Sequence, residues 1–132
     1  MAVIPDGYLD LLEKKITFAN LATVLKDGSP QVTPIWFDYT GGKIRINTAR
    51  GRVKSRTLKP NTHIAMAIMD PANPYRYVQI RGRVLTATEN GADAHIDSLA
   101  KKYLGKDKYP FRQPSEQRVM YEIEPLAVQA MG

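Results

Sequence analysis

Short apolar segments separated by tight turns restrict this chain to few possible folds. Residues 18–25, 31–39 and 43–48 have the β-branched, aromatic or alternating composition of strands. The strong turn signals KDGS and TGG connect them. Strands joined by such short turns pair antiparallel, so the sequence predicts a meander. Pro34 within the second segment indicates an edge, a bulge or a position where no backbone donor is needed.

The rest of the chain predicts three more strands. Residues 63–69 are almost wholly apolar, which favours a strand buried on both faces. A loop at residues 70–74 precedes a long strand at residues 75–88, in which Gly82 indicates a bulge or bend. Residues 118–127 alternate and complete the sheet. Six or so antiparallel strands with apolar centres predict a closed or nearly closed barrel, because closure removes exposed edges.

Three short helices are expected around this sheet. Asp6 can cap the first, which runs to about residue 15. Residues 52–58 predict a second helix that stops before a proline. Thr88 or Asn90 can cap the third, whose apolar residues recur at helical spacing, and Gly105 ends it.

The positive charge of the chain is concentrated in one segment. Residues 43–59 hold seven of the 19 lysines and arginines, and no acidic residue lies between Asp38 and Asp70. This window carries a charge of +7, whereas the other 12 cations and 13 acids sum to −1, so the net charge of +6 is local. Gly51 gives a flexible joint between the strand and the short helix of this segment.

Arginines and lysines at the start of a helix oppose its macrodipole. The arrangement is explained if an anion binds there, since N–H groups, dipole and side-chain charges would all favour one negative group. Phosphate is the leading candidate. A solvated charged face is the alternative interpretation.

Composition excludes several classes of protein. With 132 residues, 43% of them hydrophobic, the chain is expected to form one globular domain, residues 1–132. The absence of cysteine excludes disulfides, thiolate metal sites and a cysteine nucleophile. No signal peptide or apolar span is visible, so we expect a cytoplasmic protein without a membrane partner. His63 and His95 lack a paired carboxylate motif, so neither a metal site nor a catalytic residue is predicted.

Four motifs follow one another along the chain: VTPIWF at residues 32–37, Thr48 with RGRVKSRTL at residues 50–58, YRYVQIRGRV at residues 75–84, and LAKKYLG at residues 99–105. Together they resemble the split β-barrel family related to pyridoxamine 5′-phosphate oxidase, and most of all its reductases that use the deazaflavin coenzyme F420. The resemblance covers nearly the whole chain. It implies a mainly β split barrel of six or seven antiparallel strands with short peripheral helices. It also implies a homodimer with two cofactor sites at the subunit interface.

The resemblance also implies which residues bind the cofactor. Arg52 and Lys54 match the family's phosphate-binding pair, with Thr48 and Arg50 beside them. Relatives often have Asn where Thr57 stands, so this chain cannot supply the amide contact of that position. The other matched positions belong to the strand that runs along the cofactor ring and to aromatic residues that border the pocket: Thr33, Pro34, Ile35, Trp36, Tyr75 and Tyr77.

The choice of cofactor can be argued from missing charges. Oxidases of this superfamily that hold FMN place an Arg and a Lys on the second strand to bind the phosphate, and our register puts Thr33 and Asp38 there. Two lost charge-assisted contacts would cost roughly 3–6 kcal/mol. Coenzyme F420 has a phosphodiester and an anionic glutamate tail, which suit a longer row of cations: Arg50, Arg52, Lys54 and Arg56. FMN is the alternative cofactor.

The expected reaction is hydride transfer from the reduced deazaflavin to a conjugated alkene, imine or similar small acceptor. The proton would come from solvent or from a hydroxyl such as that of Tyr77. A non-catalytic nucleic-acid binder is an alternative of another class, because a basic stripe is its usual footprint. No aromatic residue lies between Tyr39 and Tyr75 to stack on bases, so no nucleic-acid partner is expected. A cofactor carrier or haem-binding relative without turnover is a third hypothesis.

Overall fold

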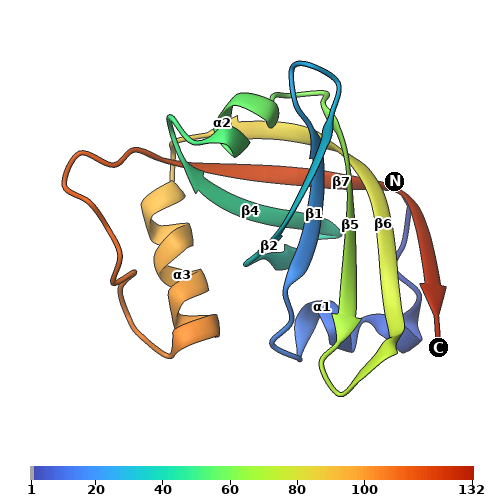
Figure 1. The fold of residues 1–132 in the computed structure, drawn as a ribbon. Coiled ribbons are helices and arrows are strands. Elements are labelled where there is room, and N and C mark those ends of the chain that lie inside the picture. The colour runs from blue at the N-terminus through green and yellow to red at the C-terminus, as the bar shows by residue number, and fades with distance from the viewer. Residues whose placement is uncertain (1) are drawn as a thin grey trace.

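All strands of the computed structural model, which describes residues 2–132, belong to one sheet (Figure 1). The strands are β1 (Ala19–Val24), β2 (Pro30–Ile35), β3 (Asp38–Thr40), β4 (Lys43–Ala49), β5 (His63–Asp70), β6 (Asn73–Thr88) and β7 (Arg118–Met131). Their order is β2-β1-β5-β6-β7-β4-β3, and neighbours pair antiparallel throughout. The predicted mainly β, seven-stranded split barrel is confirmed.

The sheet is closed into a barrel by the chain between β2 and β3. These strands are consecutive in sequence, yet they lie at the two opposite edges of the sheet. Trp36 and Phe37 therefore carry the chain from one edge to the other. The prediction of one continuous strand over residues 31–39 is wrong, because its two halves pair with different partners, β1 and β4. Pro34 lies on an edge strand, one of the three predicted settings.

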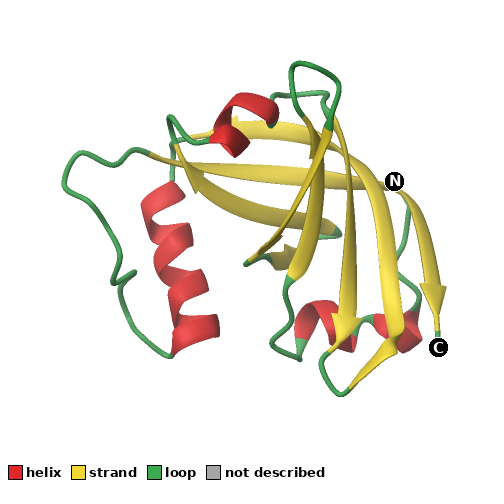
Figure 2. Ribbon diagram, in the orientation of Figure 1, coloured by secondary structure: helices red, strands yellow, loops and turns green. Residues whose placement is uncertain are grey.

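Short helices lie around the barrel (Figure 2). They are η1 (Asp6–Tyr8), α1 (Asp10–Glu13), α2 (Val53–Thr57) and α3 (Ala92–Leu104). The predicted first helix is broken into a 3₁₀ turn and one α-turn, and Asp6 lies inside the 3₁₀ turn rather than capping it. Gly7 weakens a continuous helix at this point.

The two ends of α3 differ from each other in how well the sequence predicted them. Gly91, in the left-handed region at φ 74°, precedes the helix, so the capping prediction for Thr88 and Asn90 is wrong. The Thr88 hydroxyl instead accepts a hydrogen bond from the Asn90 N–H at 3.0 Å, which makes a local turn. Gly105 ends the helix at φ 72°, as predicted.

The core fills the inside of the barrel with side chains that alternate along the strands. On β5, Ile64, Met66 and Ile68 are buried, whereas Ala65 and Ala67 on the other face are only half-buried. The prediction that this strand is buried on both faces is therefore wrong for the single chain. β5 therefore carries a small apolar face, formed by Ala65 and Ala67, that is directed out of the barrel.

Gly82 lies where the register between β6 and β7 shifts, so the predicted irregularity is confirmed. A Cβ atom added there would lie 2.5 Å from the backbone oxygen of Glu124. Only glycine allows the two strands to approach this closely.

We expect Gly82→Ala to lower the free energy of unfolding by about 1–3 kcal/mol, because the backbone of β7 would have to move. Urea denaturation measures the change. Gly7→Ala is the matched control, since an added Cβ there meets nothing within 4 Å. Equal stability of the two variants would contradict this account.

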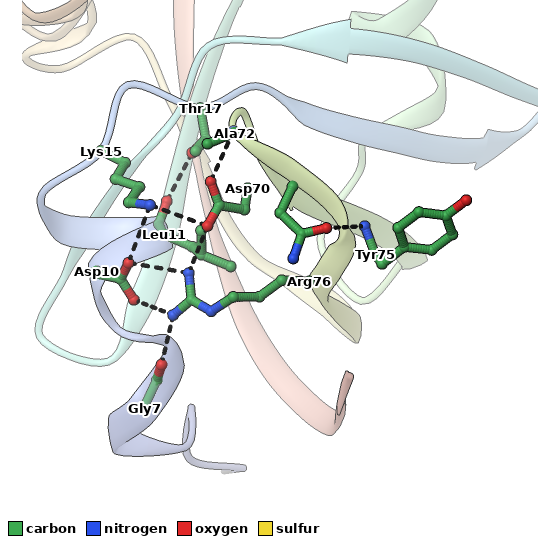
Figure 3. Close-up of polar contacts among 10 residues, drawn as sticks. Gly7, Asp10, Leu11, Lys15, Thr17, Asp70, Ala72, Tyr75 and Arg76 are labelled. Carbon is green, nitrogen blue, oxygen red and sulfur yellow. Dashed lines mark hydrogen bonds and ion pairs between the residues drawn. The ribbon is translucent and has the colours of Figure 1, made fainter. Parts of the chain in front are cut away.

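A cluster of charged groups joins the N-terminal helices to the turn between β5 and β6 (Figure 3). The Arg76 guanidinium donates to Asp10 at 2.6 and 3.1 Å and to Asp70 at 3.0 Å, and the Lys15 ammonium also donates to Asp70 at 3.0 Å. Asp70 is the last residue of β5, and its carboxylate is an ion-pair partner. The loop between β5 and β6 is shorter than the predicted residues 70–74, because β6 already begins at Asn73. These ion pairs, together with the buried side chains of Ile4, Leu11 and Leu12, fix the N-terminal segment to the barrel.

This cluster should make the fold sensitive to acid. The backbone N–H of Ala72, and then Lys15 and Arg76, lower the pKa of Asp70 from 3.8 to about 2. A lowered folded-state pKa stabilises the protein above the unfolded value and loses this contribution as the pH falls. Between about pH 4 and 2, Asp70→Asn should therefore show a shallower loss of stability than the wild type in urea titrations. The exposed carboxylate variant Asp107→Asn should keep the wild-type slope.

Candidate cofactor site

Two cavities lie on either side of α2. The first, which we call the aromatic cavity, has a volume of about 250 Å³ and lies among the ends of β2 and β4, α2, α3 and the segment that follows α3. Its walls include four aromatic residues: Phe18, Trp36, Tyr109 and Phe111. The second, the basic cavity, has a volume of about 760 Å³ and is lined by three cations, Lys26, Arg56 and Lys59, and by no acidic residue.

Six of the predicted site residues line the aromatic cavity. They come from the end of β2, the crossing segment, the end of β4 and α2: Pro34, Ile35, Trp36, Thr48, Arg52 and Lys54. Thr57 lines the basic cavity instead, and its hydroxyl donates to the carbonyl oxygens of Val53 and Lys54. The single turn of α2 thus directs neighbouring residues to different sides.

The other four predicted residues line neither cavity. Arg50 is exposed and forms an ion pair with Glu89. Thr33 is in the middle of β2, opposite Leu21 of β1. Tyr75 and Tyr77 lie on β6, and 80% of the Tyr75 surface is exposed.

The proposed row of four cations is not one continuous row. Arg52 and Lys54 face the aromatic cavity, Arg56 faces the basic cavity, and Arg50 is paired with Glu89. Because α2 has only five residues, its dipole contributes little, and attraction for an anion must come from side-chain charge.

The positive charge of Lys54 is disfavoured by its surroundings in the aromatic cavity. Burial, and then the nearby charge of Arg52, lower the pKa of Lys54. Arg52 has an internal partner, because its guanidinium lies 3.4 Å from the carboxylate of Glu116. An anion bound between Arg52 and Lys54 would offset their repulsion.

A buried hydrogen-bond chain supports this cavity from behind. His95 is 4% exposed, and its Nε2 lies 3.0 Å from the Asp38 carboxylate, which also accepts two bonds from Arg45 at 2.7 and 2.9 Å. The His95 Nδ1 lies 3.1 Å from the side-chain amide of Asn47. His95 is thus a packing histidine, and Asp38 is an ion-pair partner within the fold.

Arg118 is one of the cavity residues that the sequence did not indicate. It is only 5% exposed, and its guanidinium donates to the Asn47 side-chain oxygen at 2.8 Å and to Glu116 at 3.0 Å. Its guanidinium carbon also lies 5.2 Å from the centre of the Tyr109 ring. These bonds fix the Asn47 amide, so that its nitrogen faces His95 Nδ1 and the ring proton of His95 is on Nε2, toward Asp38. No local pattern marks a single arginine at the start of a strand as buried.

We expect Asn47→Ala to destabilise the protein by about 1–3 kcal/mol, because it leaves buried groups of His95 and Arg118 without a partner. Thermal or urea unfolding measures the loss. The exposed position Asn90 supplies the control, Asn90→Ala. A stability change no larger than that of the control would show that the hydrogen bonds of Asn47 do not support the cavity.

The aromatic wall is ordered by Tyr103 of α3. Its ring stacks on Trp36 with centroids 5.1 Å apart and planes at 5°, and Tyr109 meets Trp36 edge-on at 6.1 Å. The Tyr103 hydroxyl donates to the Thr17 carbonyl at 2.6 Å and accepts from the Phe37 N–H at 3.2 Å. Burial raises the pKa of Tyr103 to about 12, so this hydroxyl is structural rather than acidic.

Two other kinds of site were sought in residues 2–132. No group of three or more histidine, cysteine or acidic side chains is arranged to hold a metal ion in this part of the chain. Nor does any helix within these residues combine the length and apolar character that crossing a membrane would require.

The comparisons with known proteins agree with this architecture. The family model described as pyridoxamine 5′-phosphate oxidase matches residues 4–132. The chain belongs to this family. The resemblance on which the sequence analysis relied is therefore confirmed. A comparison with curated protein sequences found no match.

Solved structures of the same fold include proteins that are named for different functions. An F420 reductase is similar over 96% of this chain and 98% of its own, with 35% identity and a TM-score of 0.82. The conserved hypothetical protein Rv2991 of Mycobacterium tuberculosis covers 98% of this chain and 85% of its own at 20% identity, with a TM-score of 0.71. The heme storage protein HutZ of Vibrio cholerae covers 99% and 96% at 12% identity, with a TM-score of 0.68. The last two share the fold alone.

Proposed function

We propose that this member of the pyridoxamine 5′-phosphate oxidase family is an F420-dependent oxidoreductase that transfers a hydride to a small organic acceptor, a conjugated alkene or imine. One observation carries the proposal: Arg52 and Lys54 face the same cavity as the strand end at Pro34 and the aromatic rings. A flat redox ring with a phosphate group needs both surfaces together. The 35% identity to an F420 reductase supports this choice of coenzyme.

The residues of the aromatic cavity have the chemical types that such a coenzyme requires: cations, a hydroxyl and flat apolar surfaces. Arg52 and Lys54 would bind the phosphate, Thr48 would offer a hydroxyl, and Trp36 with Ile35 would border the ring. When bound and reduced, the deazaflavin would supply the hydride. The protein's part is to orient the ring, restrict water and leave one face open to the acceptor. Solvent is the proposed source of the proton, because Tyr77 does not line this cavity.

The size of the cavity supports a homodimer. At about 250 Å³ it is smaller than the roughly 300–1,000 Å³ of ordinary ligand pockets, so one chain makes an incomplete site. The outer face of β1 and β5 carries the small, half-buried side chains of Ala22, Ala65 and Ala67, and Val32 of β2 is 65% exposed. We propose that a second copy covers this face, and that the exposed Tyr75 borders the site of that partner.

We propose that the basic cavity binds the anionic glutamate tail of the coenzyme. Its cations, Lys26, Arg56 and Lys59, lie on the other side of α2 from Arg52 and Lys54. A coenzyme with its phosphodiester at α2 could extend its glutamate tail around the helix into this region. Thr57 would then border the tail rather than the ring.

An FMN-dependent oxidoreductase is the second candidate, favoured by the family to which the chain belongs. The predicted register placed Thr33 and Asp38 on one strand beside an FMN phosphate, but Asp38 lies on β3, bonds to Arg45 and His95, and does not line the aromatic cavity. Thr33 does not line this cavity either. The 35% identity to an F420 reductase is therefore what favours the deazaflavin over FMN.

We expect Arg52→Ala and Lys54→Ala each to weaken F420 binding by about 1.5–3 kcal/mol, the range for charged hydrogen bonds. Fluorescence titration measures the affinity, and consumption of the reduced coenzyme with a conjugated enone measures turnover. The exposed variant Lys14→Ala should bind as the wild type does. Wild-type affinity in both cavity variants would refute the phosphate assignment.

A further inference from the structure

The segment after α3 is held over the aromatic cavity by few contacts. Residues 105–117, which we call the strap, contain neither helix nor strand, and Figure 1 shows them, orange to red, beside α3. Tyr109 and Glu116 are half-buried, and the other residues of the strap are exposed. The strap nevertheless contributes two rings to the cavity, those of Tyr109 and Phe111.

The middle of the strap is attached to α3 mainly through the carboxylate of Asp97. Its Oδ1 accepts a hydrogen bond from the Tyr109 N–H at 2.8 Å and another from the Arg112 guanidinium at 2.7 Å, and the Lys108 ammonium lies 3.9 Å from Oδ2. Asp97 therefore meets three strap residues at once. Arg112 has one further partner on the helix, Asp93, at 3.3 Å.

The two ends of the strap are anchored separately from its middle. At one end the strap leaves α3 at Gly105. At the other end, the Arg50 N–H donates to the Gln117 carbonyl at 2.8 Å, and Glu116 bonds to Arg118 at 3.0 Å. The middle can therefore move while both ends stay in place.

Apolar packing adds little to hold the middle closed. Phe111 is 63% exposed and touches Tyr109 edge-on, with centroids 5.7 Å apart. Tyr109 in turn meets the edge of Trp36 at 6.1 Å, and its ring also lies 5.2 Å from the guanidinium carbon of Arg118. A segment with few buried apolar contacts opens at low free energy, so the charged contacts of Asp97 decide its position.

We propose that Asp97 is a positioning residue that latches the strap, and that the strap opens to admit a planar aromatic ligand and closes with Tyr109 and Phe111 against it. The identity of the ligand rests on the proposed function. The latch itself does not, because it consists of contacts within the chain.

The latch can be tested on the protein alone. Trypsin can cut the strap after Lys106, Lys108 or Arg112, and the chain has one tryptophan, Trp36, whose emission reports on the packing of Tyr109. Asp97→Asn should raise the rate of cleavage in the strap about tenfold, since cleavage follows the population of the open state. It should also shift the Trp36 emission to longer wavelength.

Matched variants separate the latch from a general change of charge. Asp107→Asn removes a carboxylate of the strap that is 90% exposed and pairs with Lys101, and should leave cleavage and emission unchanged. Asp97→Glu, which keeps the carboxylate, should restore part of the protection. Arg112→Gln weakens the latch from the strap side, so the test survives if the Asp97 variants fold poorly. Because this variant lacks one trypsin site, its cleavage is compared with the wild type after Lys106 and Lys108 only.

The coenzyme supplies the second arm of the experiment. F420 should protect the wild-type strap from trypsin, and Asp97→Asn should release F420 about tenfold faster with a smaller change in its rate of association. Wild-type cleavage and emission in both Asp97→Asn and Arg112→Gln would overturn the latch. An opened strap in these variants, with no F420 bound even by the wild type, would support the latch and contradict the proposed function instead.

Discussion

The chain leaves one edge of the sheet at Ile35 and joins the opposite edge at Asp38, so only two residues span the closure of the barrel. Phe37 is fully buried, and both of its backbone polar groups are held by α3: its N–H by the Tyr103 hydroxyl at 3.2 Å and its carbonyl by the Lys102 ammonium at 2.7 Å. This crossing docks α3 against the barrel and turns Trp36 onto the Tyr103 ring. The aromatic cavity forms beside it, so closure of the fold and construction of the site depend on the same few bonds.

Much of the fold could be predicted because it depends on local chemistry. The turns at KDGS and TGG and the left-handed end of α3 at Gly105 follow from residues close in sequence. The division of residues 31–39 between two edges could not be predicted, because it is decided by pairing with strands elsewhere in the chain. The same holds for Thr88, whose hydroxyl makes a local turn where Gly91 begins the helix.

The candidate site divides in the same way. Arg52, Lys54 and the segment 34–36 could be predicted because each lies in a short motif, and the fold brings them to one cavity. The partition of Arg56 and Thr57 to the other side of α2 depends on the orientation of a single helical turn. Tyr109, Phe111 and Arg118 come from a segment without regular periodicity or from the first residue of a strand, so nothing local distinguishes them. Their role follows only from the side of the barrel on which the chain returns.

We propose that the pair of cations beside an aromatic wall, with three further cations on the other side of α2, selects a deazaflavin coenzyme. Titration of the protein without coenzyme against F420 and against FMN at the same ionic strength tests it most directly. We expect F420 to bind more tightly than FMN by about two orders of magnitude or more, because its anionic glutamate tail can reach the cations of the basic cavity and FMN has no such tail. Equal affinity for the two, or tighter binding of FMN, would contradict it.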